Sequence, residues 1–419
     1  MRTRVRVPLN GSGAAVDFDD CPNVFLHRHV QLMNGRQQLA LAKWPFPDAQ
    51  HARLGHCVGS GYFAAQLGTA VGLPRDEVLA LKIAGLTHDI GHGACSHVIE
   101  SITKLYGVEH HDMTLEKLTE MQHVIQQYCD YGLVRAILEG EHALSPFVSS
   151  IVGGDKVDYV MRDRHHCGFE TKVDPRHIYA GARLVGPERR LAFEHRTKAL
   201  TNLLREWWGA HTEIYLHKEV EIPRAMFRRA ANFHHDATGW DCNDIYDMLD
   251  SDLEALFRSS PSAASDLQRH IDHGAQYHVY GALHHDMQEP ENDTVVTSLK
   301  PGEFTLRHAF ALEAELSKEA GIPRHGVIVT VSDGIDRLHA KGKANGIYEV
   351  GRDGVPKPFG DQHPGVVNGL EHDTYRHFAL RVVVLPEYWE KARSSLPPLA
   401  EINARAEEMA RQPYDAVKR

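Results

Sequence analysis

The sequence lacks any apolar run of the roughly 18–20 residues that a membrane-spanning helix needs. Charged residues near its start are not followed by an apolar segment, so the pattern of a secretory signal is missing as well. Its six cysteines are dispersed without a CxxC pair, a usage that favours reduced thiols. These absences predict a cytoplasmic protein without a membrane partner.

The sequence also lacks an excess of basic residues. Its formal net charge is −10 with His neutral, which argues against a broad surface for stable nucleic-acid binding. A local basic pocket for a phosphorylated small molecule remains compatible with that charge. The 419 residues, 42% of them hydrophobic and 24% charged, are typical of a soluble globular protein with one large or two ordinary domains.

Histidine, by contrast, is abundant, with 30 copies. The densest stretch runs from Gly85 to His97 and follows an apolar segment, residues 78–86, that is typical of a buried helix. In it, His88 and His92 are four residues apart and would share a helix face beside Asp89. Imidazole and carboxylate ligands suit a borderline divalent metal.

A His-Asp dipeptide alone is weak evidence, because the chain has five of them and most such pairs are surface pairs or helix caps. A metal site needs ligands from several segments, and the candidates are His56, His88, Asp89 and Asp155, which a helical bundle could bring together. The alternative is that His56 is a buried, hydrogen-bonded histidine and Asp155 a helix cap. Asp158 and Arg162 could simply form an ion pair.

The order of patterns predicts a mainly α protein: a helical bundle with a smaller mixed α/β C-terminal lobe. We expect an N-terminal tail or edge strand over residues 1–20, a helical domain over 21–287 and the mixed lobe over 295–419, after a surface connection at 288–294. Long helices are expected over residues 58–71, 115–131, 197–218, 245–257, 306–320 and 387–409, and strands over 326–332 and 378–385.

Four pieces of the sequence, in order, carry a family resemblance over roughly residues 25–170. The first is Gln38-Leu39 together with Arg53-Leu54-Gly55-His56, and the second is Thr87-His88-Asp89-Ile90-Gly91-His92-Gly93-Ala94-Cys95-Ser96-His97. The third is Glu109-His110, and the last is Asp155-Lys156-Val157-Asp158-Tyr159-Val160-Met161-Arg162-Asp163. The chain thereby resembles the HD-domain phosphohydrolase superfamily and, within it, the deoxynucleoside triphosphate triphosphohydrolases. We find no further likeness after about residue 220.

The resemblance implies a role for each matched residue. His56, His88, Asp89 and Asp155 would bind the metal ion. His97 would give a proton to the leaving sugar oxygen or position water, and His92 and His110 would assist at the phosphates. Arg53 and Lys156 would hold phosphate oxygens, Tyr159 would lie against the deoxyribose, and Asp163 with Gln38 would bind its 3′-hydroxyl.

The resemblance implies hydrolysis of a deoxynucleoside triphosphate to deoxynucleoside and triphosphate. The cofactor would be a divalent ion (iron, manganese, nickel or zinc at the HD site, with magnesium possible at the phosphates), and relatives form homo-oligomers. Two alternatives stay open. One is an HD phosphohydrolase acting on a nucleoside monophosphate, cyclic nucleotide or phosphorylated metabolite, and the other is a non-catalytic nucleotide sensor or nucleic-acid-binding regulator.

Overall fold

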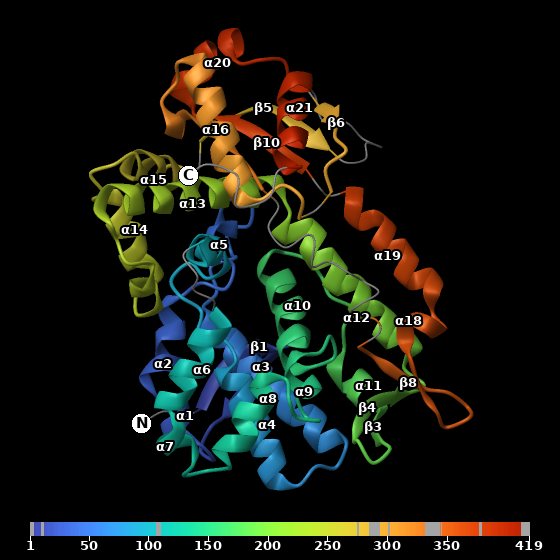
Figure 1. Cartoon of the computed structure of the whole chain (residues 1–419). Coiled ribbons are helices and arrows are strands. Elements are labelled where there is room, and N and C mark those ends of the chain that lie inside the picture. Colours follow the sequence, from blue (N-terminus) through green and yellow to red (C-terminus); the bar gives the residue numbers. More distant parts are fainter. Residues whose placement is uncertain are drawn as a thin grey trace.

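The computed structural model describes residues 4–9, 12–105, 110–274, 276–284, 294–300, 302–331, 344, 346–376 and 379–411. These residues form a mainly helical molecule, as the sequence predicts, with three small sheets. In Figure 1 the N-terminal helices fill the lower half, and most of the C-terminal part lies above them across the long helix α13 (Lys218–Thr238), while residues 348–362 of that part lie low at the right.

Helices make up most of the N-terminal half. Their bounds are α1 Pro22–Phe25, α2 Arg28–Leu32, α3 Arg53–Ala70, α4 Arg75–Thr87, α5 His97–Leu105, α6 His110–Glu120, α7 Gln122–Ile125, α8 Tyr131–Glu139, α9 Pro146–Ser149, α10 Gly154–His166 and α11 Pro175–Tyr179. The expected tail is an antiparallel hairpin of β1 Arg4–Leu9 and β2 Ser12–Asp17.

The centre of the bundle is the packing of α3 against α4 and α10, and glycine permits it. A Cβ on Gly85 of α4 would lie 2.7 Å from the Gly61 Cα of α3, and one on Gly154 of α10 would lie 2.1 Å from the Ser60 carbonyl oxygen. Side chains at these positions would separate the helices. The close approach brings one end of α3, the end of α4 and the start of α10 together.

The middle of the chain runs through β3 Ala182–Val185, β4 Arg190–Glu194, α12 Thr197–Gly209, the π-helical turn η3 Ala210–Tyr215 and α13 Lys218–Thr238. It continues with the 3₁₀ helix η4 Cys242–Tyr246, α14 Asp250–Arg258 and α15 Ala264–Asp272. The C-terminal part contains β5 His278–His284, β6 Thr294–Val296, α16 Leu306–Ala320, β7 Val327–Val329, β8 Tyr348–Val350, β9 Pro356–Pro358, α18 Phe359–Gln362, α19 Pro364–Arg376, β10 Ala379–Val384, α20 Trp389–Ser395 and α21 Leu399–Ala410.

Several expected helices are interrupted, some of them where a proline ends a helix or a capping residue begins a new one. The predicted helix over residues 387–409 is wrong because Pro397 and Pro398 separate α20 from α21. The one over 115–131 is likewise split: α6 and α7 end early, and Asp130 caps a new helix, α8, by accepting a hydrogen bond from the Gly132 N–H. The predicted 197–218 helix turns π-helical after Gly209, and the 245–257 helix begins only at Asp250.

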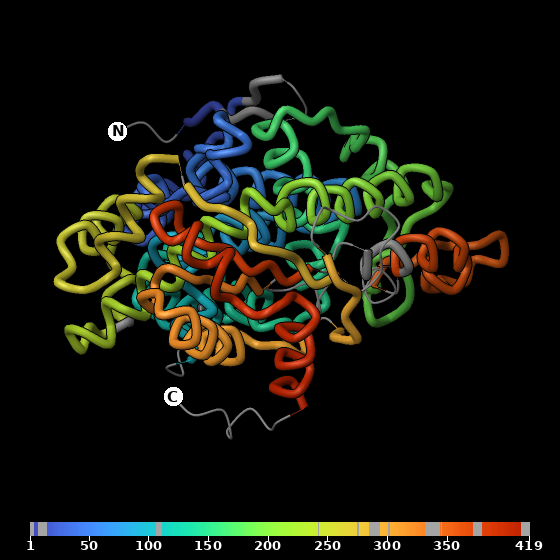
Figure 2. Tube along the Cα trace, turned by 90° about the horizontal axis from the view of Figure 1, so that it is seen from above, coloured from blue at the N-terminus to red at the C-terminus, as the bar shows by residue number. Residues whose placement is uncertain are grey.

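The C-terminal sheet has the strand order β6-β5-β10-β7, and α16, α20 and α21 lie beside it (Figure 1). Figure 2, seen from above, shows most of this orange and red part lying over the helical body, with α18 and α19 off to one side. The predicted strands over 326–332 and 378–385 correspond to β7 and β10. Of the predicted connection at 288–294, residues 288–293 lie outside the described part of the chain.

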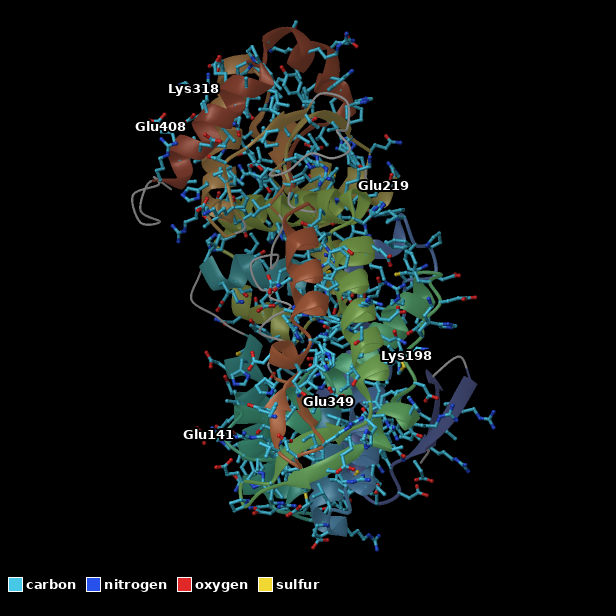
Figure 3. The ribbon with its side chains drawn as sticks, turned by 90° about the vertical axis from the view of Figure 1, so that its right-hand side faces the viewer. Glu141, Lys198, Glu219, Lys318, Glu349 and Glu408 are labelled. Carbon is cyan, nitrogen blue, oxygen red and sulfur yellow. The ribbon has the colours of Figure 1, made fainter. Side chains whose placement is uncertain are left out.

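The second sheet, β3-β4-β8-β9, joins segments that are far apart in the sequence. Phe193 of β4 pairs in parallel with Glu349 of β8, and Thr197 donates a hydrogen bond to the Glu349 carboxylate. In Figure 3, Glu349 accordingly lies in the lower half of the molecule, well below Lys318 and Glu408 of the upper lobe. The division into domains at residues 287 and 295 stays a prediction. β8 lies after residue 295 in the sequence but pairs with β4 of the helical body, and β9 pairs with β8.

Candidate metal centre

Three helices place the predicted metal ligands at one point. His56 lies in α3, His88 and Asp89 follow α4, and Asp155 lies in the first turn of α10. The Nε2 atoms of His56 and His88 are 3.2 Å apart, and Asp155 Oδ1 lies 3.5 Å from the first and 3.7 Å from the second. Asp89 Oδ1 is 3.2 Å from His88 Nε2, and Asp89 Oδ2 is 3.6 Å from His56 Nε2.

The two imidazoles are oriented by hydrogen bonds on their far sides. His56 Nδ1 donates to Asp158 Oδ2 at 2.9 Å, and His88 Nδ1 donates to the Gly85 carbonyl oxygen at 2.8 Å. Each Nε2 is thereby left to face the cluster, the arrangement that metal-bound histidines usually have. The expected Asp158–Arg162 ion pair is present, with two contacts of 2.8 Å, and Asp158 also holds His56.

These spacings fit a shared divalent ion. Ligand atoms about 2.0–2.2 Å from one ion lie about 3–3.5 Å from one another, close to the distances among the two Nε2 atoms and the two carboxylates. Burial raises the pKa of Asp89, but the charges of His88, His92 and Arg53 outweigh it and hold that pKa well below its usual range. Burial likewise raises the pKa of Asp155, but Lys156 and the two histidines outweigh it and hold that pKa well below its usual range. Both carboxylates are therefore ionised.

The same carboxylates also change the pKa of His56. Burial lowers its pKa, but hydrogen bonds to Asp155 and Asp158 raise it to about 9. Without a metal ion, the negative cluster thus draws a proton onto His56. A divalent cation would supply the positive charge in its place, so the donor set and its electrostatics both fit a metal.

Two cationic side chains, Arg53 and Lys156, lie beside the cluster. Arg53 is 1% exposed, and it donates to Asp89 Oδ2 at 2.5 Å, to Ser96 Oγ at 3.0 Å and to the Gln38 carbonyl oxygen at 3.4 Å. The Lys156 ammonium contacts Asp155 Oδ2 at 2.5 Å and lies 5.6 Å from the Tyr159 ring centroid. Positive charge is therefore available on two sides of the ligand cluster.

Two of the predicted histidines, His92 and His97, lie next to each other beside Asp89. His92 is 3% exposed, and its Nε2 is 3.3 Å from Asp89 Oδ1. Burial and the nearby Arg53 charge lower the His92 pKa well below its usual range. The ring of His97 lies 4.4 Å from that of His92 (centroid to centroid), and its side chain is 63% exposed. His110 begins α6, and its side chain lies outside the described part of the structure.

An aromatic and carboxylate wall extends from the metal cluster along α10. The Tyr159 ring lies 6.3 Å from the His56 ring, and its hydroxyl accepts a 2.8 Å hydrogen bond from Trp207 Nε1. One turn further on, Asp163 accepts hydrogen bonds from His51 Nε2 at 2.9 Å and the Tyr215 hydroxyl at 2.6 Å.

Sequence reasoning missed four members of this wall: His51, Trp207, His211 and Tyr215. Three of them come from the end of α12 and from η3, at residues 207, 211 and 215. Their spacing of four was the signal that could have found them, since it places them on one helical face. The predicted Gln38 lies beside His51, whose carbonyl oxygen accepts from the Gln38 N–H at 3.0 Å. The buried Oε1 of Gln38 has no hydrogen-bond partner among the residues that the structure describes.

A helical bundle that collects two histidines, two aspartates and flanking cations in this way defines a metal-dependent hydrolase of phosphate compounds. The comparisons agree: residues 53–145 match the HD domain, and residues 209–395 match the HD associated region. The chain belongs to the HD-domain phosphohydrolases. The second match also corrects the expectation that the likeness ends near residue 220.

Similar proteins include the "Deoxynucleoside triphosphate triphosphohydrolase SAMHD1 homolog" of Dictyostelium discoideum, 27% identical over 214 residues, which are 45% of this chain and 40% of that protein. The chain thus spans well under half the length of that relative. A hypothetical protein from Aquifex aeolicus (TM-score 0.67, 18% identity, 93% of this chain and 99% of that one) shares the fold. So does a phosphohydrolase from Bacteroides thetaiotaomicron (TM-score 0.66, 20% identity, 86% and 94%).

Among the helices that the structure describes, none has the length and apolar character to cross a membrane.

Proposed function

We propose that the chain hydrolyses deoxynucleoside triphosphates to deoxynucleoside and triphosphate. The observation that carries the proposal is the face of α10, on which Asp155, Tyr159 and Asp163 follow one another at intervals of four residues. These three span about 12 Å along the helix, at about 1.5 Å per residue. The helix thus presents, in order, a metal ligand (Asp155), an aromatic ring (Tyr159) and a carboxylate that can accept a hydrogen bond from a hydroxyl (Asp163). This order suits a phosphate chain followed by a sugar.

At the phosphate end, a divalent ion held by His56, His88, Asp89 and Asp155 would lower the pKa of water and neutralise phosphate charge. Arg53 and Lys156 bind phosphate oxygens, with His92 and His110 assisting. Water adds to the α-phosphorus as its bond to the sugar 5′-oxygen breaks, and the exposed His97 hands its proton to that oxygen. Iron, manganese, nickel and zinc all suit the ligand set, and magnesium would accompany the phosphates.

At the sugar end, the Tyr159 ring lies against the deoxyribose and leaves little room for a 2′-hydroxyl. Asp163 and Gln38 bind the 3′-hydroxyl. The buried Gln38 Oε1, which has no hydrogen-bond partner within the described part of the chain, supports this role. The resemblance to triphosphohydrolases supports the same substrate class. On the family resemblance alone, we also propose a homo-oligomer.

Product analysis tests the proposal. The purified, metal-loaded chain is incubated with each dNTP and NTP, and nucleoside, nucleotides, triphosphate and phosphate are resolved. We expect deoxynucleoside with intact triphosphate, and its loss in His88→Ala but not in His177→Ala, a change at an exposed histidine. Comparable turnover of ATP and dATP contradicts the sugar assignment, and orthophosphate released from monophosphates indicates the alternative HD phosphohydrolase.

A further inference from the structure

A second group of metal-ligating atoms lies beside the first. One nitrogen each of His92 and His97 and one carboxylate oxygen of Glu100 lie within 4.8 Å of one another. None of the three belongs to the cluster of His56, His88 and Asp155. Asp89 separates the two groups, because its Oδ1 contacts both His88 Nε2, at 3.2 Å, and His92 Nε2, at 3.3 Å.

The local backbone is constrained in a way that brings these side chains together. Cys95 and Ser96 both have positive φ, 54° and 46°, which is costly for residues other than glycine. The Asp250 carboxylate accepts the Cys95 N–H at 2.6 Å and so helps to hold this turn. The turn directs the chain from His92 into α5, where His97 and Glu100 are three residues apart on one helical face.

Burial and charge also suit a cation. His92 is buried, Glu100 is 10% exposed in its side chain, and His97 is 63% exposed, so the group has a fixed inner side and an open outer side. His97 Nδ1 already contacts Glu100 Oε2 at 2.9 Å. The opposite oxygen, Oε1, is bound by the Lys104 ammonium at 2.8 Å. Lys104 thus competes with a metal ion for the same carboxylate.

We propose that His92, His97 and Glu100 form a second divalent-cation site, selective for zinc or a similarly borderline ion. Two imidazole nitrogens with one carboxylate are the ligands that such ions prefer. An ion there occupies the imidazole of His97. If the proposed triphosphohydrolase reaction holds, excess zinc therefore inhibits it by removing the proton donor.

The test measures binding and needs no substrate. The full chain, with its first site loaded, is dialysed against increasing zinc, and bound zinc per chain is measured. We expect one further zinc in the wild type, at least 10-fold weaker binding in Glu100→Gln, and no change in Glu170→Gln, which alters an exposed glutamate elsewhere. Lys104→Met removes the competing ammonium and should tighten the second ion several-fold.

Opposite effects of the Glu100 and Lys104 changes distinguish the site from loss of folding, which circular dichroism checks in each variant. No further zinc in the wild type overturns the proposal. So does equal binding in all variants, which would indicate scattered surface histidines. If the second zinc binds but dNTPs are not hydrolysed, the site stands and the proposed reaction fails.

Discussion

At the scale of single residues, Asp158 links the metal ligands to the body of α10. It is 1% exposed, and its carboxylate accepts from His56 on one side and from the guanidinium of Arg162 on the other. A Cβ on Gly59 would lie 1.8 Å from Asp158 Oδ1, so glycine is required for this approach. Asp158 therefore fixes the ring of a metal ligand without facing the metal site itself.

We expect Asp158→Asn to weaken metal binding by about 10–100-fold, the usual effect of losing a carboxylate behind a metal-bound histidine. An amide can still accept one hydrogen bond but no longer carries the charge that favours a basic His56 ring. Metal affinity measured by competition with a chelator provides the check. Arg162→Lys is the matched control, since it keeps a cation beside Asp158, and it should affect metal affinity less than Asp158→Asn does. Equal losses in both variants would argue for a general loss of packing.

The sequence was most informative about residues whose roles depend on local spacing. Patterns of a few residues, together with the family resemblance, selected His56, His88, Asp89 and Asp155, and the structure brings the four side chains together. The aromatic wall could not be selected in the same way. Trp207 and Tyr215 lie some fifty residues after Tyr159 and Asp163, and only the fold shows that they contact them.

At the scale of elements, the site depends on how closely α3 and α4 approach, and that distance is set by Gly61 and Gly85. Gly85→Ala would place a Cβ 2.7 Å from the Gly61 backbone, which cannot rotate away as a side chain could. We expect a loss of about 1–3 kcal/mol in the free energy of unfolding, measured by urea denaturation. Metal affinity should also fall, because His88 follows α4 directly.

The control is another helical glycine. Gly369 in α19 is exposed, and a Cβ added there would meet none of the described residues within 4 Å outside the backbone of its own helical turn. Gly369→Ala should leave stability unchanged or raise it by about 0.5–1 kcal/mol through helix propensity. A Gly85→Ala protein as stable as the wild type would show that the two helices can separate at little cost.

Helix positions were predictable from the sequence to the extent that local signals set them. The expected helices over 58–71 and 306–320 match α3 and α16 because their apolar periodicity is long and uninterrupted. Short strands such as β4 and β8 were not predicted. Each has only three to five residues, too few to show a clear alternation. Each has a nearby antiparallel partner, β3 or β9, but the pairing of β4 with β8 joins segments about 150 residues apart, which no local pattern specifies.

At the scale of the whole molecule, a buried ion pair joins α13 to the C-terminal lobe. Arg229 Nε lies 2.8 Å from Glu313 Oε2 of α16, and both side chains are at most 1% exposed. The Glu313 Oε1 atom accepts the Val329 N–H of β7 at 2.9 Å. The Arg229 guanidinium lies 4.6 Å and 4.2 Å from the ring centroids of Phe233 and Phe310, so its surroundings are largely apolar.

This pair should make stability depend on pH. Burial raises the pKa of Glu313 from its ordinary 4.5 to about 7, although the Arg229 charge opposes the rise. The folded chain therefore binds a proton more tightly than the unfolded chain does. The stabilisation that this proton provides is complete below pH 4.5 and is lost as the pH rises to about 7. The difference between the two pKa values, about 2.5, corresponds to at most about 3 kcal/mol in the free energy of unfolding.

Glu313→Gln removes this titration, and we expect the variant to gain stability relative to the wild type as the pH rises from 4.5 to 7, with a constant difference above that range. Urea denaturation at a series of pH values measures the difference, in which the contributions of all other groups cancel. Glu315→Gln, at an exposed position of the same helix, should instead give a curve parallel to the wild type. A parallel curve for Glu313→Gln as well would mean that Glu313 stays ionised in the folded protein. The lobe contact would then be held by a full ion pair throughout this range, with Arg229 favouring the charged carboxylate more strongly than burial disfavours it.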